Sequence, residues 1–135
     1  HRDLHSFPTR RSSDLLDKFN LLPYVKELPR NLPYGIQRRV EICRALVVNP
    51  SLMLLDEPAA GMNQGEIGEL INLVRWVKDE FKVTVLIIEH QMRVIMNICE
   101  RIQVLDFGST IAEGTPAEIR NNLLVIKAYL GEEVT

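Results

Sequence analysis

Two groups of polar residues follow directly on short apolar runs, and each group has side chains that could take part in catalysis. Asp56 and Glu57 follow the apolar run 52–55, and His90 follows, after one glutamate, the β-branched run 83–88. One carboxylate can bind a hard cation such as Mg²⁺, and its neighbour can orient or deprotonate a water molecule. A histidine at the next strand end could contact a phosphate group. Polar residues also occur wherever a strand reaches solvent, so either group alone leaves both interpretations open.

The elements that must position these residues alternate between strands and helices. Apolar residues at three- and four-residue steps predict helices, and short apolar runs predict strands. The helices are expected over 35–48, 65–80 and 91–99, and the strands over 52–55 and 83–88. This alternation predicts an α/β fold with a mostly parallel sheet covered by helices on both faces. The polar residues would then share the edge at which the carboxyl ends of the strands meet.

The C-terminal part of the chain is predicted to form a β-hairpin followed by helices. The hairpin strands are expected over 102–105 and 110–113, with Asp-Phe-Gly-Ser between them as the turn. Thr115 is expected to cap the next helix, since Glu118 lies three residues further on and would complete a capping box. A final helix is expected near 124–130 and should end at the glycine that follows.

Four motifs in this order resemble those of the ABC transporter ATPases. The run Leu52-Met-Leu-Leu-Asp-Glu-Pro58 is similar to the Walker B strand of that family. The run Leu32-Pro-Tyr-Gly-Ile-Gln-Arg-Arg39 resembles the signature loop, usually written LSGGQ, and the start of its helix. Ala60-Gly-Met-Asn63 stands where the family has its D-loop, and Thr84–His90 resembles the strand that ends in the switch histidine. The motifs span essentially all of residues 16–135.

The resemblance implies a fold and a set of roles. Residues 16–135 would be the C-terminal half of an ABC ATPase domain, an incomplete P-loop NTPase domain that works on ATP with Mg²⁺. Asp56 would bind the metal, Glu57 would polarise the attacking water, and His90 would sense the γ-phosphate. ATP hydrolysis would then power transport.

The signature loop would serve a second subunit. A helix N-terminus attracts anions, and in the family this one contacts ATP held by a second ABC ATPase subunit in a head-to-tail dimer. Transmembrane permease subunits would be the other partners, at the cytoplasmic face of a bacterial or archaeal plasma membrane. The residues expected to contact nucleotide in this way are Leu32, Pro33, Tyr34, Gly35, Ile36, Gln37 and Asn63.

Departures from the usual signature indicate a subfamily. Pro33 stands in place of serine, Tyr34 in place of the first glycine, and Ile36 in place of glutamine. Leu-Pro-Tyr-Gly resembles the ATPases of branched-chain amino acid importers, most of all the larger of their two ATPases. In those ATPases a glutamine normally follows the glycine, so Ile36 is an unusual substitution at this position. Runs 59–63 and 111–119 point to the same subfamily. Related ATPases for urea uptake or lipopolysaccharide export share much of the pattern and remain alternatives.

One motif of the family is absent from the printed sequence. It contains no Gly-x-x-x-x-Gly-Lys-Ser/Thr run and no Gly-Lys pair, so the loop and lysine that bind the β- and γ-phosphates are missing. We therefore expect the chain alone to be inactive, and a non-catalytic interaction fragment is the alternative function. The ATPase heads of chromosome and repair proteins are a third interpretation, but coiled-coil heptads do not precede Leu32.

The first fifteen residues are predicted not to belong to the domain. Segment 1–15 is rich in arginine and serine and has no clear helical or strand period. Residues 5–15 resemble a translated sequencing-library adapter fused to a truncated reading frame, and a disordered native arm is the alternative. Two acidic residues argue against a transit peptide. The domain is thus expected to begin at Leu16.

Composition narrows the remaining classes. The sequence is 46% hydrophobic and 25% charged, which is ordinary for a globular protein, and its net charge of −2 gives no reason to expect nucleic acid as a partner. Cys43 and Cys99 are predicted to be buried reduced thiols. The sequence has no apolar run of the ~18 residues that a membrane span requires.

Overall fold

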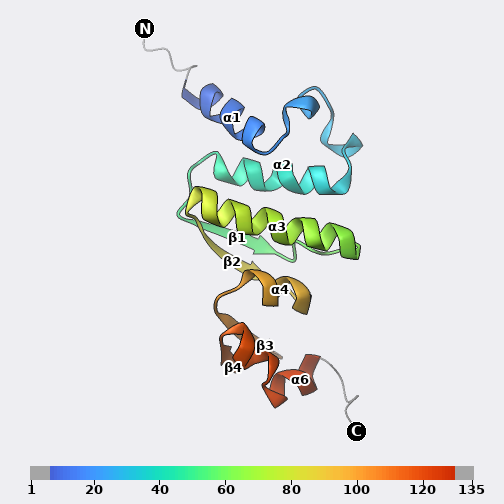
Figure 1. The fold of residues 1–135 in the computed structure, drawn as a ribbon, viewed down its shortest axis with the longest axis vertical. Coiled ribbons are helices and arrows are strands. Elements are labelled where there is room, and N and C mark those ends of the chain that lie inside the picture. Colours follow the sequence, from blue (N-terminus) through green and yellow to red (C-terminus); the bar gives the residue numbers. More distant parts are fainter. Residues whose placement is uncertain (1–6, 130–135) are drawn as a thin grey trace. The chain divides into compact units, whose positions relative to one another are not determined.

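The computed structural model describes residues 7–129, with side chains from residue 12 onward, and the chain divides into two units, with the boundary between Ile88 and Glu89. Figure 1 shows the elements in chain order. The first unit contains α1 (Phe7–Lys18), the 3₁₀ turns η1 (Leu22–Tyr24) and η2 (Pro29–Asn31), α2 (Tyr34–Leu46), β1 (Leu52–Asp56), α3 (Gln64–Phe81) and β2 (Thr84–Ile88). The second contains α4 (Met92–Ile98), β3 (Ile102–Asp106), β4 (Ser109–Gly114), α5 (Pro116–Arg120) and α6 (Leu123–Tyr129).

Strands β1 and β2 form a parallel pair, as the sequence predicted. Leu52 lies opposite Thr84 and Asp56 lies opposite Ile88, so both strands end at the same edge. Helices α2 and α3 lie side by side next to this pair (Figure 1). Their apolar stripes build the core of the unit, which includes Ile42, Cys43, Leu46, Ile67, Leu70, Ile71, Val74 and Val77. The sheet edge that carries the acidic pair is thus fixed by a packed helical layer.

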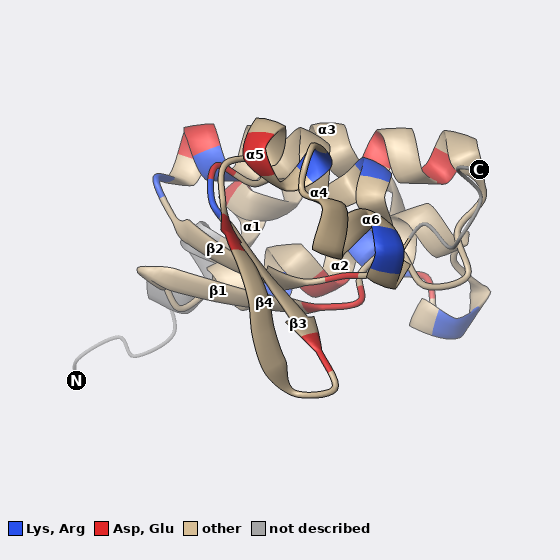
Figure 2. Ribbon diagram, turned by 90° about the horizontal axis from the view of Figure 1, so that it is seen from below, with Lys and Arg blue, Asp and Glu red and all other residues tan. Residues whose placement is uncertain are grey.

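The opposite face of this strand pair is not covered, which corrects the prediction of helices on both faces. Leu52, Leu54, Leu86 and Ile88 are 50%, 67%, 57% and 62% exposed, whereas Met53, which points to the other face, is 4% exposed. Figure 2 shows β1 and β2 almost entirely in tan, without charges between Leu52 and Asp56. Wholly apolar strands predict burial on both faces, but in the described part of the chain only one face is covered by helices.

The sheets are also smaller than predicted. Instead of one mostly parallel sheet, the described residues form a parallel pair, β1–β2, and a separate antiparallel pair, β3–β4. The expected hairpin is confirmed. Its two turn residues, Phe107 and Gly108, have φ angles of 44° and 79°, and positive φ at both central positions matches the twist of a two-residue hairpin.

Helix α1 includes part of the segment that was predicted not to belong to the domain. Residues from Phe7 to Lys18 are helical, so the expected domain start at Leu16 falls inside a helix. A polar run without a clear period still forms a helix when an apolar anchor holds its end, and Leu15 is 4% exposed. The helix ends before Asn20, whose φ is 55°. Residues 1–6 lie outside the described part, and the adapter origin of 5–15 stays a hypothesis.

The capping box at Thr115 is confirmed in the second unit. The Thr115 N–H donates to Glu118 Oε2 at 2.8 Å, and the Glu118 N–H donates to Thr115 Oγ1 at 3.4 Å. The expected end of the last helix at Gly131 lies outside the described residues. Across residues 7–129, every helix is too short or too polar to cross a bilayer.

Candidate functional site

Asp56 and Glu57 stand at the carboxyl end of β1. The Glu57 N–H donates to the Ile88 carbonyl at 2.8 Å, so the hydrogen-bonded ladder between the strands continues one residue past the register. The φ angle of Glu57 is 43°, a left-handed conformation that costs a non-glycine residue about 1–2 kcal/mol. Both residues are exposed. The backbone therefore turns sharply at Glu57 and leaves two adjacent carboxylates at a solvent-facing sheet edge.

The loop after Glu57 is held by consecutive turns. The Ala60 N–H donates to the Glu57 carbonyl and the Met62 N–H to the Ala59 carbonyl, each at 3.1 Å. Ala59 has no exposed surface, and Gly61 has a φ of 74°, which a glycine adopts at no steric cost. The loop is thus anchored at one end by a buried residue and shaped at the other by a glycine.

Asn63, predicted to contact nucleotide, has a role within its own chain. Its side-chain oxygen accepts from the Glu66 N–H at 3.0 Å, and the Glu66 carboxylate accepts from the Asn63 N–H at 2.8 Å. This capping box begins α3. The structure therefore accounts for the asparagine as the N-cap of α3, which begins directly after the loop that follows Glu57.

A hydrogen bond between two of its predicted site residues, Gln37 and Leu32, closes the signature loop. The Gln37 side-chain N–H donates to the Leu32 carbonyl at 2.8 Å, and Leu32 is buried. Pro33 is the N-cap of α2 and offers no side-chain oxygen to the first turn. Ile36 is half-buried on that turn, and its N–H donates to the Pro33 carbonyl at 2.9 Å. The first turn of α2 thus has a fixed backbone whose end is not capped by a side chain.

Gly35 is not required by the chain's own packing. Its φ is not positive, and a Cβ atom would meet only Glu69 Oε2, at an ordinary 3.6 Å. A glycine without such a local need fits a position where something outside the chain approaches the backbone closely. The anion-binding role of the α2 N-terminus stays a prediction.

Tyr34 joins the signature loop to the loop after Glu57. Its hydroxyl donates to the Ala60 carbonyl at 3.0 Å. The sequence did not predict this hydrogen bond. The two residues are 26 positions apart, and no sequence pattern indicates a contact between them. The structure thereby joins Tyr34 of the signature loop to the loop that runs from Glu57 to Asn63.

His90 lies in the second unit, and its neighbour Glu89 positions it. The Glu89 side chain has no exposed surface, and its Oε2 accepts from the N–H groups of His90 and Gln91, each at 3.0 Å. The His90 side chain is 59% exposed. The sequence expectations gave Glu89 no role. The signal that identifies it is an acid just before a helix start, where Gln91 is an N-cap without a side-chain bond.

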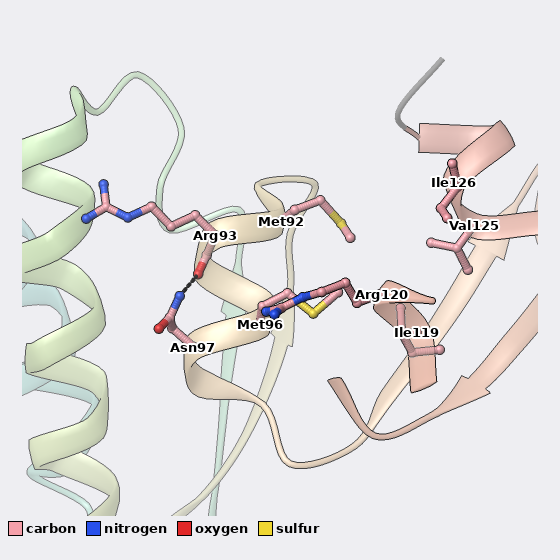
Figure 3. A pocket seen from close by; sticks show the side chains of 8 residues that line it. All are labelled: Met92, Arg93, Met96, Asn97, Ile119, Arg120, Val125 and Ile126. Atoms are coloured by element: carbon pink, nitrogen blue, oxygen red, sulfur yellow. Dashed lines mark hydrogen bonds between the residues drawn. The ribbon is translucent and has the colours of Figure 1, made fainter. Parts of the chain in front are cut away.

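A separate cavity of about 270 Å³ lies within the second unit (Figure 3). Met92 and Met96 of α4 face Ile119 of α5 and Val125 of α6 across it. The Arg93 side chain extends away from the cavity in Figure 3, while Asn97 donates to the Arg93 carbonyl at 2.7 Å. None of the residues predicted for the site lines this cavity.

Comparisons with known proteins agree with the motifs. A family model described as "ABC transporter" matches residues 8–60, and one described as "Branched-chain amino acid ATP-binding cassette transporter" matches residues 109–135. The chain is 46% identical over 122 residues to LivG of Salmonella typhimurium, a high-affinity branched-chain amino acid transport ATP-binding protein. It is 35% identical over 123 residues to LptB of Haemophilus influenzae, a lipopolysaccharide export system ATP-binding protein.

These matches cover most of this chain but only part of the relatives. They span 90% of this chain and 48% of LivG, and 91% of this chain and 51% of LptB. The crystal structure of the ADP conformation of MJ1267, an ATP-binding cassette of an ABC transporter, matches with a TM-score of 0.83 and 29% identity. That match covers 93% of this chain and 50% of the other. The chain thus spans about half the length of the proteins it matches.

These matches show that the chain belongs to the ABC transporter ATP-binding family.

Proposed function

We propose that the protein to which this chain belongs hydrolyses ATP to drive the import of branched-chain amino acids. The 46% identity to LivG and the C-terminal match to the branched-chain amino acid family model support this choice. Export of lipopolysaccharide is the second candidate, supported by the 35% identity to LptB. Because the C-terminal model matches a region outside the ATPase motifs, it weighs in favour of the import system.

The observation that carries the proposal is the geometry at Glu57. A left-handed backbone and a hydrogen bond to the Ile88 carbonyl hold this residue at the sheet edge. Its carboxylate therefore emerges beside that of Asp56, and both face solvent. A substrate phosphate at the same edge would place a water molecule within reach of Glu57, which would orient it and accept its proton.

The residues present suit Mg²⁺ rather than a metal held by protein alone. Within residues 7–129, no three His, Cys, Asp or Glu side chains form a cluster that could enclose an ion. Mg²⁺ commonly binds through one or two carboxylates together with water and substrate phosphates, and Asp56 offers such a carboxylate. When bound, the ion would neutralise charge on the phosphates.

The other predicted residues would act on the γ-phosphate. His90 would contact it in the subunit's own site, with its backbone fixed by Glu89. The amide end of α2, at Tyr34–Gln37, together with Leu32, Pro33 and Asn63, would serve ATP held by a second subunit in a head-to-tail dimer. Permease subunits would anchor this pair at the cytoplasmic face of a bacterial or archaeal plasma membrane.

A chimera tests the proposal. Residues 7–135 would replace the matched half of Salmonella LivG, so that α1 stays intact, and ATP hydrolysis and ATP binding would be measured with Mg²⁺. Glu57→Gln should lower turnover by at least about 100-fold, because it removes the base but not the binding surface. Glu27→Gln, at an exposed position in the first unit, is the matched control and should leave turnover unchanged.

Two outcomes would contradict the proposal. Hydrolysis retained in the Glu57→Gln chimera would remove Glu57 from its role. Failure of an ATP-hydrolysing chimera to restore growth on limiting leucine in cells lacking LivG would contradict the import of branched-chain amino acids. The 135-residue chain alone should bind ATP weakly or not at all, and a micromolar dissociation constant would contradict this expectation.

A further inference from the structure

A tyrosine and an arginine on one face of α2 connect two loops that the proposed function assigns to different nucleotides. The Tyr34 hydroxyl donates to the Ala60 carbonyl at 3.0 Å, and Arg38 Nη2 donates to the Tyr34 oxygen at 2.9 Å. A carbonyl only accepts and a guanidinium only donates. The direction of the hydrogen-bond chain from Arg38 through Tyr34 to Ala60 is therefore fixed.

Arg38 holds the tyrosine ring in place. Its guanidinium carbon lies 5.5 Å from the centre of the Tyr34 ring, within the range of a cation–π contact. Its Nη1 pairs with Glu41 Oε2, and its side chain is 20% exposed. Arg38 Nε is buried and has no hydrogen-bond partner among the described residues. Because the Arg38 guanidinium is largely removed from water, its hydrogen bonds to Glu41 and Tyr34 hold it in one orientation. The same contacts hold the Tyr34 side chain.

Ala60 is one turn from the catalytic carboxylate. Its N–H donates to the Glu57 carbonyl, while its own carbonyl receives the Tyr34 hydroxyl. The next residue, Gly61, has a φ of 74°, and a Cβ atom at this position would have no heavy atom within 4 Å, so side-chain packing does not restrain the backbone here. The Tyr34 bond therefore restrains the side of this turn that packing leaves open.

We propose that Tyr34 is a positioning residue that couples the signature loop to the loop after Glu57, residues 57–63, of the same chain. The inference rests on the proposed function, in which the first turn of α2 meets ATP held by the second subunit while Glu57 acts on the subunit's own ATP. A shift of that turn on nucleotide contact is carried through the Tyr34 hydroxyl to the turn at Glu57. The two ATP sites of the dimer thereby become cooperative. A glycine at this position, which is usual in the family, has no side chain to make the link.

The first experiment tests the contact in the 135-residue chain itself. Tyr34→Phe removes the hydroxyl and keeps the ring. Hydrogen exchange at the Ala60 and Met62 amides, both hydrogen-bonded within the loop, should become about five-fold faster, as expected for one lost hydrogen bond. Tyr129→Phe is the matched control, because it removes a hydroxyl that donates to the Leu105 carbonyl at 2.6 Å in the second unit. Unchanged exchange at these amides in Tyr34→Phe overturns the proposal.

The second experiment tests the coupling in the chimera. The rate of ATP hydrolysis by the unsubstituted chimera should depend sigmoidally on ATP concentration. Tyr34→Phe should lower the Hill coefficient to about 1 and lower kcat about five-fold. Arg38→Lys keeps the charge but loses the planar fork, and should lower the Hill coefficient less. Tyr129→Phe should change neither quantity.

The outcomes separate the two proposals. If the unsubstituted chimera hydrolyses no ATP, the proposed function fails, and the exchange experiment alone decides the Tyr34 contact. If the chimera is active and Tyr34→Phe keeps its Hill coefficient, the coupling fails while the proposed function stands. A fall in kcat matched by a fall in Tm, without a change in the Hill coefficient, shows a purely structural role and also overturns the coupling.

Discussion

The ring of Phe19 meets the ring of Trp76 edge to face, with centroids 5.0 Å apart and an interplanar angle of 80°. Phe81 completes the cluster, at 6.1 Å from Phe19 and 5.6 Å from Trp76. Phe19 is 2% exposed, and it lies just after the end of α1. The cluster therefore fastens the N-terminal segment to α3.

Phe19→Ala should destabilise the first unit by about 3 kcal/mol, because it removes a buried ring and leaves a cavity. Urea unfolding followed by the fluorescence of Trp76, the single tryptophan of the sequence, would measure the loss. Leu22→Ala, at a position that is 46% exposed, is the control and should change stability by less than about 0.5 kcal/mol. Equal midpoints for the two variants would show that the cluster does not fasten the segment.

Glu89→Ala should loosen the start of α4 and release the backbone of His90. The buried carboxylate accepts two N–H groups, and leaving such donors without a partner costs about 1–3 kcal/mol. Amide exchange at His90 and Gln91 should accelerate. Glu89→Gln keeps an acceptor oxygen and should show a smaller effect, so identical exchange in both variants would contradict the capping role.

The exposed face of β1 and β2 should make the isolated chain self-associate. Leu54 and Leu86 lie opposite each other and are 67% and 57% exposed, and contiguous apolar surface of this kind favours association. The double substitution of both leucines by threonine keeps β-propensity and should shift the sedimentation profile toward monomer. Val48→Thr changes a valine outside this strand pair that is 79% exposed, and should leave association unchanged. The idea fails if both variants sediment like the unsubstituted chain.

Cys43 should react with iodoacetamide more slowly than Cys99 in the folded chain. Neither forms a disulfide, but Cys43 is buried whereas Cys99 is half-buried, and burial raises the pKa of the Cys43 thiol. The thiolate is the reactive form, so alkylation of Cys43 should stay slow until the pH exceeds the ordinary thiol range. Because folding favours the protonated thiol, this group lowers stability only as the pH rises above that range. Mass spectrometry would compare the two sites, and equal rates in the absence of denaturant would contradict the prediction.

The sequence predicted those features that depend on neighbouring residues alone, such as helix caps and the ends of apolar strands. Thr115 and Glu118 form the expected capping box, and Asp56 ends a strand opposite Ile88 as the apolar runs indicated. Features that depend on distant partners were not predictable. The Tyr34 contact with Ala60 requires the packing of α2 against the loop after β1.

The errors have a common physical origin. Periodicity describes which residues a helix or strand could bury, not which neighbours are present to bury them. Leu54 lies in a wholly apolar strand, a pattern typical of burial on both faces, yet it is 67% exposed in the described part of the chain. The segment before Leu16 was predicted not to belong to the domain and has no clear helical period, yet Phe7–Lys18 is helical. In both cases the tertiary neighbours decided the outcome.

The left-handed backbone at Glu57 has an evolutionary consequence. A glycine would adopt this φ without steric cost, so Glu57→Gly relieves backbone strain at the position where the carboxylate is proposed to act. Selection for a robust fold and selection for turnover therefore favour different residues at this position. Stabilising screens that ignore activity should drift toward glycine at this site, and a glutamate retained in them would need another explanation.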